Sequence, residues 1–441
     1  MSTPVASDIG LSDCAADYRR DMATVEAPIE RRVASYIDEL LSEEPVVLLT
    51  GARTAGKSTL VRRLARERGA RFVDLDDPLE RQAAQGNPGL FVADEGLVVI
   101  DEFQYAPELV SAIKATLNTD LRPGRFVLTG SSRWQSIPEV ARHLTGRAHP
   151  VTLWPFSQGE LAGRREVFLD AIASGDDLLS SPRATLTRHD LIAKATTGGY
   201  PIAVARGASA QFRWFESLVK LVLARDAIEL RAVRQPELLG RVLRLSAART
   251  ASVLNASDLA RDAGISSDMA GELLRLLEAI YLILRIPAWS ENLNARVAHR
   301  PKIHIADPGL AAHLLRLNPV SLARPTGAAL VRLGQLLETF AATEIVRQAS
   351  WADRAPTISH FRTKDDVEVD LIIEFPDGTV GAIEVKAASR VTSADGRGLR
   401  FLRDRLGERF LIGVILCTID APVRVDERIT AVPFETLWMS R

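Results

Sequence analysis

The chemically most informative residues of this 441-residue sequence lie between Pro45 and Leu64, in the stretch PVVLLTGARTAGKSTLVRRL. An apolar run ends at Thr50, a glycine-containing loop with one lysine follows, and a helical pattern begins after Ser58. Backbone N–H groups of such a loop bind phosphates, the lysine reaches the β- and γ-phosphates, and the serine hydroxyl ligates Mg²⁺. The sequence therefore predicts a nucleotide site. Its residues are Gly51, Ala52, Arg53, Thr54, Ala55, Gly56, Lys57, Ser58 and Thr59.

A second pair of polar residues ends the apolar strand of the stretch GLVVIDEFQ. Asp101 stands at the carboxyl end of that strand, where an aspartate near a phosphate loop holds Mg²⁺ through water. The adjacent Glu102 would polarise the attacking water as a general base. The competing interpretation is an ordinary strand with a polar end, which is the less common case at this distance after a phosphate loop.

Two further stretches carry polar side chains suited to the same chemistry. RFVLTGSS is an apolar strand that ends in Thr129 and Ser131, and ligands of open α/β sheets bind at such ends. Either residue would contact the γ-phosphate or the water. In RHLTGRAHPVTLW, Arg147 precedes the next strand and would neutralise charge on the transferring phosphoryl group, in the same subunit or from a neighbour. A plain surface arginine is the competing interpretation.

The stretch VDLIIEFPDGTVGAIEVKA carries a second constellation. Asp370 lies in one predicted strand, and Glu384 and Lys386 share one face of the next strand because they are two residues apart. If the strands pair as a hairpin, two carboxylates and one ammonium come together, with Glu338 of the preceding helix as an added ligand. Such a group suits a divalent cation, Mg²⁺ or Mn²⁺, and hydrolysis of a phosphodiester. The competing interpretation is a structural hairpin that carries charged residues on its exposed face.

A parallel sheet must position the first group of residues. Segment 45–155 alternates strands and helices, which indicates a parallel sheet covered on both faces. Residues 156–235 have mostly helical patterns, broken at Thr197–Pro201. The strands of the first sheet are predicted at Val46–Leu49, Arg71–Asp74, Leu97–Ile100, Arg125–Thr129 and Pro150–Leu153.

The middle of the chain has the pattern of a winged helix. SDLARDAGISSDMAGELLRLLEA predicts a helix, a turn at Gly264 and a second helix, and two β-like runs follow at Tyr281–Ile286 and Lys302–Ala306. The presumed recognition helix, Ser266–Ala279, is acidic, which opposes a phosphate-lined groove. We therefore favour a protein partner or packing between domains over DNA. The charges of this helix are Asp268, Glu272 and Glu278 against Arg275.

Basic residues gather in two other places. One stripe precedes the winged helix, and a solvated helix face is its commoner explanation. The other follows the C-terminal constellation, where it would meet a phosphate backbone. The first stripe is Arg231, Arg234, Arg241, Arg244 and Arg249. The second is Arg390, Arg397, Arg400, Arg403 and Arg405.

The composition of the chain limits which classes of protein it can belong to. A formal net charge of −1 excludes a global basic field, so any nucleic-acid contact must be local. The cysteines, Cys14 and Cys417, have neither metal nor disulfide spacing, as expected for a reducing cytoplasm. No apolar run is long enough to predict a membrane span. The first residues lack the pattern of a signal peptide, and we expect a disordered tail there.

The order of P-loop, VVIDE, FVLTGSS and LTGRA resembles an AAA-type ATPase core. Nearly the whole chain resembles a bacterial and archaeal group known as ATP-binding proteins with such a core and a C-terminal domain of unknown function. Group-like stretches are LDDPLERQAA, YAPELVSAIK, GGYP, LLETFAATEI, HFRTKDDVEVDLIIE and GAIEVKA. The resemblance implies ATP and Mg²⁺ as cofactors. It allows a homo-oligomer.

The C-terminal constellation resembles the PD-(D/E)XK nuclease superfamily, with Val369 in place of its proline. The predicted class is α/β and multi-domain: a P-loop AAA-type sheet, a helical and winged-helix middle, and an α/β nuclease-like end. We predict a cytoplasmic ATPase coupled to a nuclease-like domain that acts on nucleic acid. The alternatives are a nucleotide-dependent switch that binds proteins, and a toxin–antitoxin or defence partner. The predicted parts are a tail (1–24), an ATPase core (25–160), a helical region (161–235), a winged helix (236–317) and a nuclease-like domain (318–441).

Overall fold

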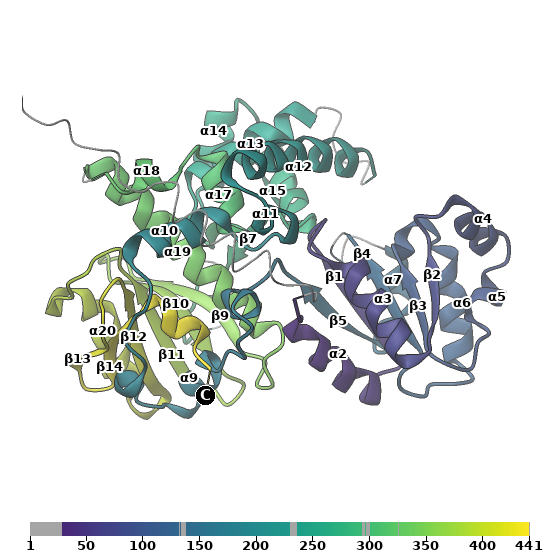
Figure 1. The fold of residues 1–441 in the computed structure, drawn as a ribbon, viewed down its shortest axis with the longest axis horizontal. Helices are drawn as coiled ribbons and strands as arrows, with labels where there is room; N and C mark the ends of the chain where they lie inside the picture. Colours follow the sequence, from purple (N-terminus) through teal and green to yellow (C-terminus); the bar gives the residue numbers. More distant parts are fainter. Residues whose placement is uncertain are drawn as a thin grey trace, which may run out of the picture.

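The structure is a computed structural model that describes residues 29–131, 133, 138–229, 236–292, 296, 300–324 and 326–440. The predicted tail at 1–24, Cys14, and Arg231 and Arg234 of the first basic stripe lie outside these residues. Figure 1 shows a lobe with the first sheet on the right and a larger body that holds the remaining elements on the left. In the part of the chain that the structure describes, no helix is both long and apolar enough to cross a membrane.

The first lobe is built on a five-stranded parallel sheet with the order β2-β3-β4-β1-β5. Its strands are β1 (Val46–Gly51), β2 (Arg71–Asp74), β3 (Val98–Asp101), β4 (Phe126–Gly130) and β5 (Ala148–Leu153). Its helices are α2 (Arg32–Glu43), α3 (Lys57–Arg68), α4 (Pro78–Gly86), α5 (Pro88–Val92), α6 (Glu108–Leu117) and α7 (Pro138–His143). The α/β class with a parallel sheet is confirmed.

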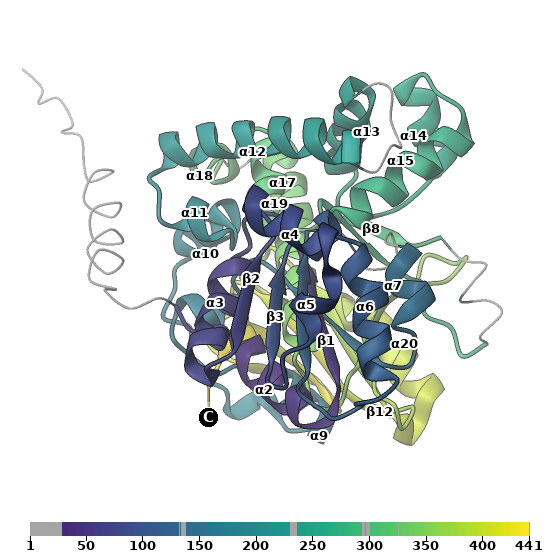
Figure 2. The ribbon, with the colours of Figure 1, turned by 90° about the vertical axis from the view of Figure 1, so that its right-hand side faces the viewer.

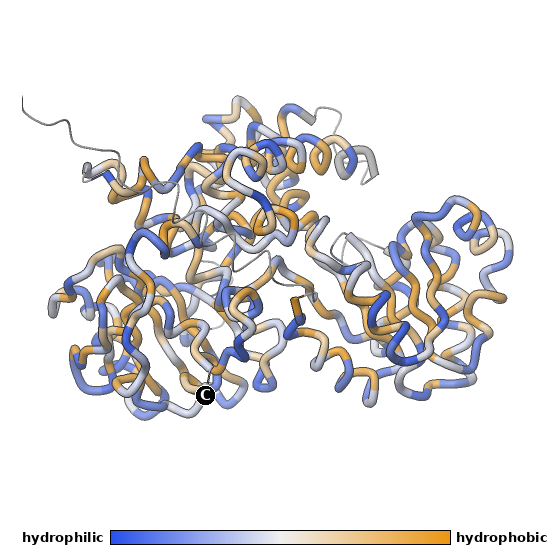
Figure 3. Tube along the Cα trace, viewed as in Figure 1, coloured by the Kyte–Doolittle hydropathy of each residue, from blue (hydrophilic) through white to orange (hydrophobic). Residues whose placement is uncertain are grey.

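Both faces of this sheet are buried, as the apolar strands require. Val47 and Leu49 of β1 point to a core shared with α2 and α3, whereas Val46 and Leu48 point to a core shared with α6. The period of two residues in a strand produces this division. Figure 2 shows helices in front of the strands, and Figure 3 shows hydrophobic segments concentrated along the strands of the lobe.

The middle of the chain is mainly helical and includes a small antiparallel sheet, β6-β8-β7. A turn at Gly264, with φ of 69°, separates two of its helices, in the order predicted for helix, turn, helix and hairpin. The winged-helix interpretation itself stays a prediction. The elements are α8 (Gln158–Leu161), α9 (Phe168–Ser174), α10 (Arg188–Thr197), α11 (Pro201–Val204), α12 (Ala208–Glu229), α13 (Pro236–Ala248), β6 (Ser252–Val253), α14 (Ala256–Ala263), α15 (Ser267–Ala279), β7 (Ile283–Ile286), β8 (Lys302–Ile305), α17 (Pro308–Leu314) and α18 (Pro319–Leu322).

The C-terminal part is a six-stranded mixed sheet with the order β13-β14-β12-β11-β10-β9. One face packs on α19 and α9, and the other face packs on α20. The sequence analysis did not predict β13 and β14, because both are short and VRVD is half polar. The elements are α19 (Gly327–Ala349), β9 (Thr357–Arg362), β10 (Glu368–Glu374), β11 (Val380–Val385), α20 (Arg397–Leu406), β12 (Phe410–Cys417), β13 (Val423–Asp426) and β14 (Ile429–Pro433).

The predicted helical region 161–235 is not one structural unit. Helix α9 packs on the C-terminal sheet, where a side chain at Gly381 would collide with Ile172. Thr185 donates to Glu435 near the end of the chain. By contrast, α10 packs on α17 and α12 on α13. Helical patterns predict helices, but the surface on which a helix packs is decided by contacts that are distant in sequence.

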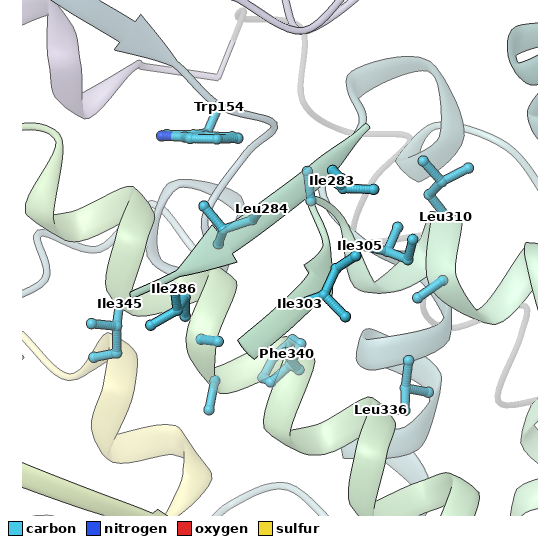
Figure 4. Close-up of a cluster of buried hydrophobic side chains, with 14 of the residues drawn as sticks. Trp154, Ile283, Leu284, Ile286, Ile303, Ile305, Leu310, Leu336, Phe340 and Ile345 are labelled. Carbon is cyan, nitrogen blue, oxygen red and sulfur yellow. The ribbon is translucent and has the colours of Figure 1, made fainter. Parts of the chain in front are cut away.

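Helix α19 joins the middle part to the C-terminal sheet. Ile303 and Ile305 of β8 and Phe340 of α19 belong to one apolar cluster, and Figure 4 shows Trp154 of the first lobe at its border. A buried ion network adds to this junction: Arg347 of α19 pairs with Asp307, whose carboxylate also accepts the Gly199 N–H at 2.8 Å. The GGYP stretch therefore binds a carboxylate between helices, where any side chain at Gly198 would collide with Asp307.

Candidate functional site

The predicted phosphate loop connects β1 to the N-terminus of α3. Gly51 is required by close packing, because a Cβ atom there would lie 2.1 Å from the Leu153 carbonyl oxygen. Gly56, with φ of 101°, precedes the first residue of the helix. Lys57 is 5% exposed, and its Nζ donates to the carbonyl oxygens of Gly51 at 2.9 Å and Ala52 at 3.1 Å. The ammonium group is thus held inside the curve of the loop, at a helix N-terminus that favours anions.

Three neighbouring strands bring the other predicted residues to the same edge of the sheet. Strand β4 lies between β1 and β3, so the carboxyl ends of all three strands are adjacent. Thr129 at the end of β4 donates its hydroxyl to Asp101 and accepts the Glu102 N–H at 3.2 Å. Asp101 and Ser131 are no more than 2% exposed. The structure thus collects Lys57, Asp101, Glu102, Thr129 and Ser131 around one edge.

Glu102 has an unusual backbone and an unusual environment. Its φ of 54° is left-handed, which is uncommon for a residue other than glycine and is found at functional sites. Burial raises the pKa of its carboxyl group, and the nearby Lys57 opposes this shift. Gln104 donates to the Glu102 carboxylate and to Ser131 Oγ at 3.4 Å. Sequence analysis did not identify Gln104, although it lies only two residues after Glu102.

Arg147 is not part of this arrangement within one chain. Its neighbour Ala148 pairs with Val46 at the amino end of β1, whereas the phosphate loop follows Gly51, which pairs with Leu153. The amino and carboxyl ends of β1 are five residues apart, which is a distance of about 17 Å in a strand. The prediction of contact within the same chain is therefore wrong in this structure, because Arg147 precedes its strand whereas the loop follows its own. Action from a neighbouring subunit stays a prediction.

The C-terminal constellation does come together. Strands β10 and β11 pair antiparallel, and the Val385 N–H donates to Asp370 Oδ2 at 2.9 Å. Lys386 Nζ lies 2.7 Å from Glu384 Oε1. Together with Glu338 these residues line an open pocket of about 610 Å³. The hairpin predicted from the sequence is the reason for this proximity, since it places Asp370 beside the strand that carries Glu384.

A residue that the sequence analysis did not identify occupies the centre of this group. Lys302, the first residue of β8, places its Nζ 2.8 Å from Glu338, 2.7 Å from Glu368 and 2.8 Å from Asp370. Its side chain is 2% exposed. Burial alone would lower the pKa of Lys302, but Asp370, Glu338 and Glu368 together raise it well above its ordinary value. Lys302 is therefore a charged ammonium among carboxylates.

With Lys302 in this position, the carboxylates do not fit a divalent cation. Asp370 and Glu338, two of the three predicted ligands, turn one oxygen each to Lys302. Burial, and then Asp370, raises the pKa of the third, Glu384, to about 8, which favours its neutral form. Across the described ranges, no three His, Cys, Asp or Glu side chains are placed to hold a metal ion. The predicted metal triad is corrected: an ammonium takes the position of the ion.

Three arginines of the predicted basic surface after the constellation have acidic partners. Arg403 pairs with Asp426 at 2.9 Å, and Arg405 pairs with Glu291 at 2.6 Å. Arg400 lies 3.7 Å from Asp426. These three arginines therefore join α20 to neighbouring segments.

The first lobe contacts the middle part next to the phosphate loop. Thr50, which precedes Gly51, shares a hydrogen bond of 2.6 Å with the Tyr281 hydroxyl, and both residues are buried. After β4, the Arg133 N–H donates to the Ala279 carbonyl at 2.9 Å, and its guanidinium lies 3.6 Å from Glu278. Glu278, one of the acids of the presumed recognition helix, thus serves an internal contact.

Residues 43–162 match the family model of the AAA domain. Residues 188–321 match a domain of unknown function, DUF8612, and residues 333–437 match another, DUF4143. The three matches cover the first lobe, the middle part with its small sheet, and the C-terminal sheet. The chain thus carries an AAA-type, P-loop ATP-binding domain followed by two further domains.

Two relatives from mycobacteria resemble most of the chain. The uncharacterized proteins Rv2008c of Mycobacterium tuberculosis and Mb2031c of Mycobacterium bovis are each 27% identical to it over 383 residues. The similarity covers 84% of this chain and 77% of each relative.

Solved structures resemble parts of the chain at lower similarity. The Walker-type ATPase PABY2304 of Pyrococcus abyssi is 19% identical, with a TM-score of 0.41, and the match covers 65% of this chain and 96% of that one. A variant of the RuvB protein of Thermotoga maritima is 16% identical, with a TM-score of 0.28, over 58% of this chain and 89% of that one.

Proposed function

We propose that this protein is a Mg²⁺-dependent ATPase whose catalytic centre is formed by Lys57, Asp101 and Glu102. The observation that carries the proposal is the position of these residues at one edge of the sheet. Lys57 follows β1, Asp101 and Glu102 lie at the end of β3, and Thr129 of the intervening strand β4 is hydrogen-bonded to both acidic residues. Ligands of open α/β sheets bind at this edge. The AAA domain match over residues 43–162 supports the same chemistry.

Each side chain has a role in this proposal. Lys57 binds the β- and γ-phosphates together with the N–H groups of the loop. Glu102 accepts the proton of the attacking water, and Gln104 holds its carboxylate in place. Oxygen donors suit Mg²⁺, so Ser58 and Asp101 would hold the ion, which supplies charge neutralisation at the phosphates.

An ATPase assay with three proteins tests this proposal. Lys57→Ala removes the loop's ammonium, so we expect ATP binding to weaken and phosphate release to stop. Lys220→Ala is the matched control, because its side chain is 71% exposed and pairs with Glu216 on the surface of α12. Equal phosphate release by the wild type and Lys57→Ala would contradict the proposal.

The C-terminal pocket supports a second candidate function, a nuclease-like centre on which the nucleotide state acts. Asp370, Glu384 and Lys386 converge there with Glu338, in the pattern that resembles PD-(D/E)XK nucleases. The substrate class would be a phosphodiester in nucleic acid. The contacts of Thr50 with Tyr281 and of Arg133 with Glu278 offer a route from the nucleotide to the middle part.

Cleavage assays distinguish this candidate from its rival, a nucleotide-dependent switch that binds a protein partner through the middle part. Single- and double-stranded DNA and RNA are incubated with Mg²⁺ or Mn²⁺, with and without ATP. Asp370→Ala and Lys386→Ala should abolish any cleavage and leave ATP hydrolysis intact, because the two sites are in separate domains. Absence of cleavage by the wild type under every condition would favour the switch, including a toxin–antitoxin or defence role.

A further inference from the structure

We propose that Lys302 is a built-in cation that takes the place of a divalent metal ion in the C-terminal carboxylate site. The proposal rests on the nuclease-like candidate for that site. It explains why a constellation that suits a metal ion is brought together and yet is arranged around an ammonium group.

The ammonium group of Lys302 is surrounded by three carboxylates. Its Nζ donates to Glu338 and Asp370, each at 2.8 Å, and forms an ion pair with Glu368 at 2.7 Å. With its side chain 2% exposed, water has little access to Nζ. A surface lysine that met these acids by chance would keep part of its charge in solvent. Lys302 instead ends within the cluster.

A divalent cation and the Lys302 ammonium cannot share this position. Both need the oxygens of Asp370 and Glu338, and two positive charges a few ångströms apart in a buried site repel strongly. Without either cation, the clustered carboxylates would repel one another and bind protons instead. Lys302 therefore satisfies the carboxylates in this structure, and a metal ion could bind them only in its place.

The contact between Lys302 and the carboxylates joins two domains. The carboxylates belong to α19 and β10, within the domain matched at residues 333–437, whereas Lys302 belongs to the domain matched at 188–321. Strand β8 pairs with β7, and Ile286 of β7 lies opposite Lys302. Two residues before β7 lies Tyr281, which bonds Thr50 beside the phosphate loop. Lys302 is thus connected to the phosphate loop through a strand pairing and the hydrogen bond between Tyr281 and Thr50.

Mn²⁺ binding to the full-length chain, measured by electron paramagnetic resonance without nucleotide, tests the proposal. All proteins carry Lys57→Ala, so that the nucleotide site contributes equally to each titration. We expect Lys302→Met to bind Mn²⁺ at least about tenfold more tightly than the parent, since the competing charge is gone. Lys302→Arg keeps the charge and should resemble the parent. Lys220→Met is the surface control, and adding Asp370→Asn to Lys302→Met should remove the gain.

Thermal unfolding provides a second measurement, and Lys302→Gln a second variant if Lys302→Met does not fold. Removal of Lys302 should lower Tm in the absence of metal, and Mn²⁺ should restore it, whereas the Tm of the parent should not respond. If the parent binds Mn²⁺ as tightly as Lys302→Met, and Asp370→Asn removes this binding, then Lys302 does not block the site and this inference alone fails. If neither neutral variant gains Mn²⁺, the carboxylates form no metal site, and the nuclease-like candidate fails with it.

Discussion

The nucleotide site and the C-terminal carboxylate site both place a buried lysine beside acids at the end of a β-strand. Lys57 is held by two carbonyl oxygens of its own loop, five and six residues away. Lys302 is held by carboxylates 36 to 68 residues away. The first lysine is thus oriented by local chain geometry, and the second by the packing of one domain on another.

This difference has a chemical consequence. The Lys57 ammonium donates to two backbone carbonyls of its loop, at a helix N-terminus that favours anions. The charge of a lysine that contacts three carboxylates is compensated within the protein. The two sites therefore differ in readiness for a ligand, although both were predicted to bind a divalent metal ion.

The largest expected effect concerns Arg147 and whether the nucleotide site is complete in one chain. If a neighbouring subunit supplies this arginine, Arg147→Ala should lower the ATPase rate by about 10⁴-fold. A mixture of Arg147→Ala and Lys57→Ala should regain activity, because one variant supplies the loop and the other supplies the arginine. Phosphate release from the mixture and sedimentation of mixed oligomers are measured together. If mixed oligomers form and activity does not recover, then Arg147 does not act on the nucleotide of a neighbouring subunit and has a structural role.

The second prediction concerns Glu102. Glu102→Gln should bind ATP with wild-type affinity and lower kcat by about 10³-fold, because the base is lost and the phosphate loop is kept. Burial raises the pKa of Glu102, so the wild-type rate should fall with decreasing pH already above 4.5, as the carboxylate becomes protonated. Glu108→Gln, on the exposed face of α6, is the control. An unchanged kcat in Glu102→Gln would remove Glu102 from the chemistry.

The third prediction concerns His304, which lies on β8 two residues after Lys302. Burial lowers the pKa of this fully buried histidine to about 3, so the folded protein holds it neutral. In the unfolded chain it binds a proton near 6.5, and its contribution to stability is therefore present above that pH and lost as the pH falls. From pH 7 to pH 5 the loss should be about 2 kcal/mol.

Urea unfolding at the two pH values measures this loss. His304→Gln should show a smaller decrease in stability between pH 7 and pH 5 than the wild type. His360, whose pKa is lowered to about 4 by burial, adds a loss of the same sign in both proteins. The exposed His189→Gln is the control. If the stability of all three proteins depended on pH in the same way, burial on β8 would not keep His304 from binding a proton in the folded protein.

The smallest expected effect concerns Tyr281, which connects the first lobe to the middle part. Tyr281→Phe removes the hydrogen bond to Thr50 and should lower the free energy of unfolding by about 1 kcal/mol, with ATP affinity unchanged. Tyr36→Phe, which loses a half-buried contact with His149, should have a smaller effect. A changed ATP affinity in Tyr281→Phe would mean that this contact also shapes the phosphate loop.

The P-loop sheet and most of the nucleotide site follow from the order of residues along the chain. The residues of the loop are contiguous, and parallel strands place their carboxyl ends at one edge, so Lys57, Asp101 and Thr129 had to be neighbours. The approach of Asp370 to Glu384 follows in the same way, because a short turn joins their strands. Both inferences depend on contacts within one loop or between strands whose direction the pattern indicates.

The surroundings of these residues, by contrast, are set by the packing of domains. Lys302 carries no local pattern that relates it to Asp370, and they meet because β8 packs on α19. The same holds for Tyr281 on Thr50, and for Arg405, which appears free in the sequence but pairs with Glu291. A charge in a sequence acquires its function from its partner, and a partner from another domain is set by long-range packing that local periodicity does not encode.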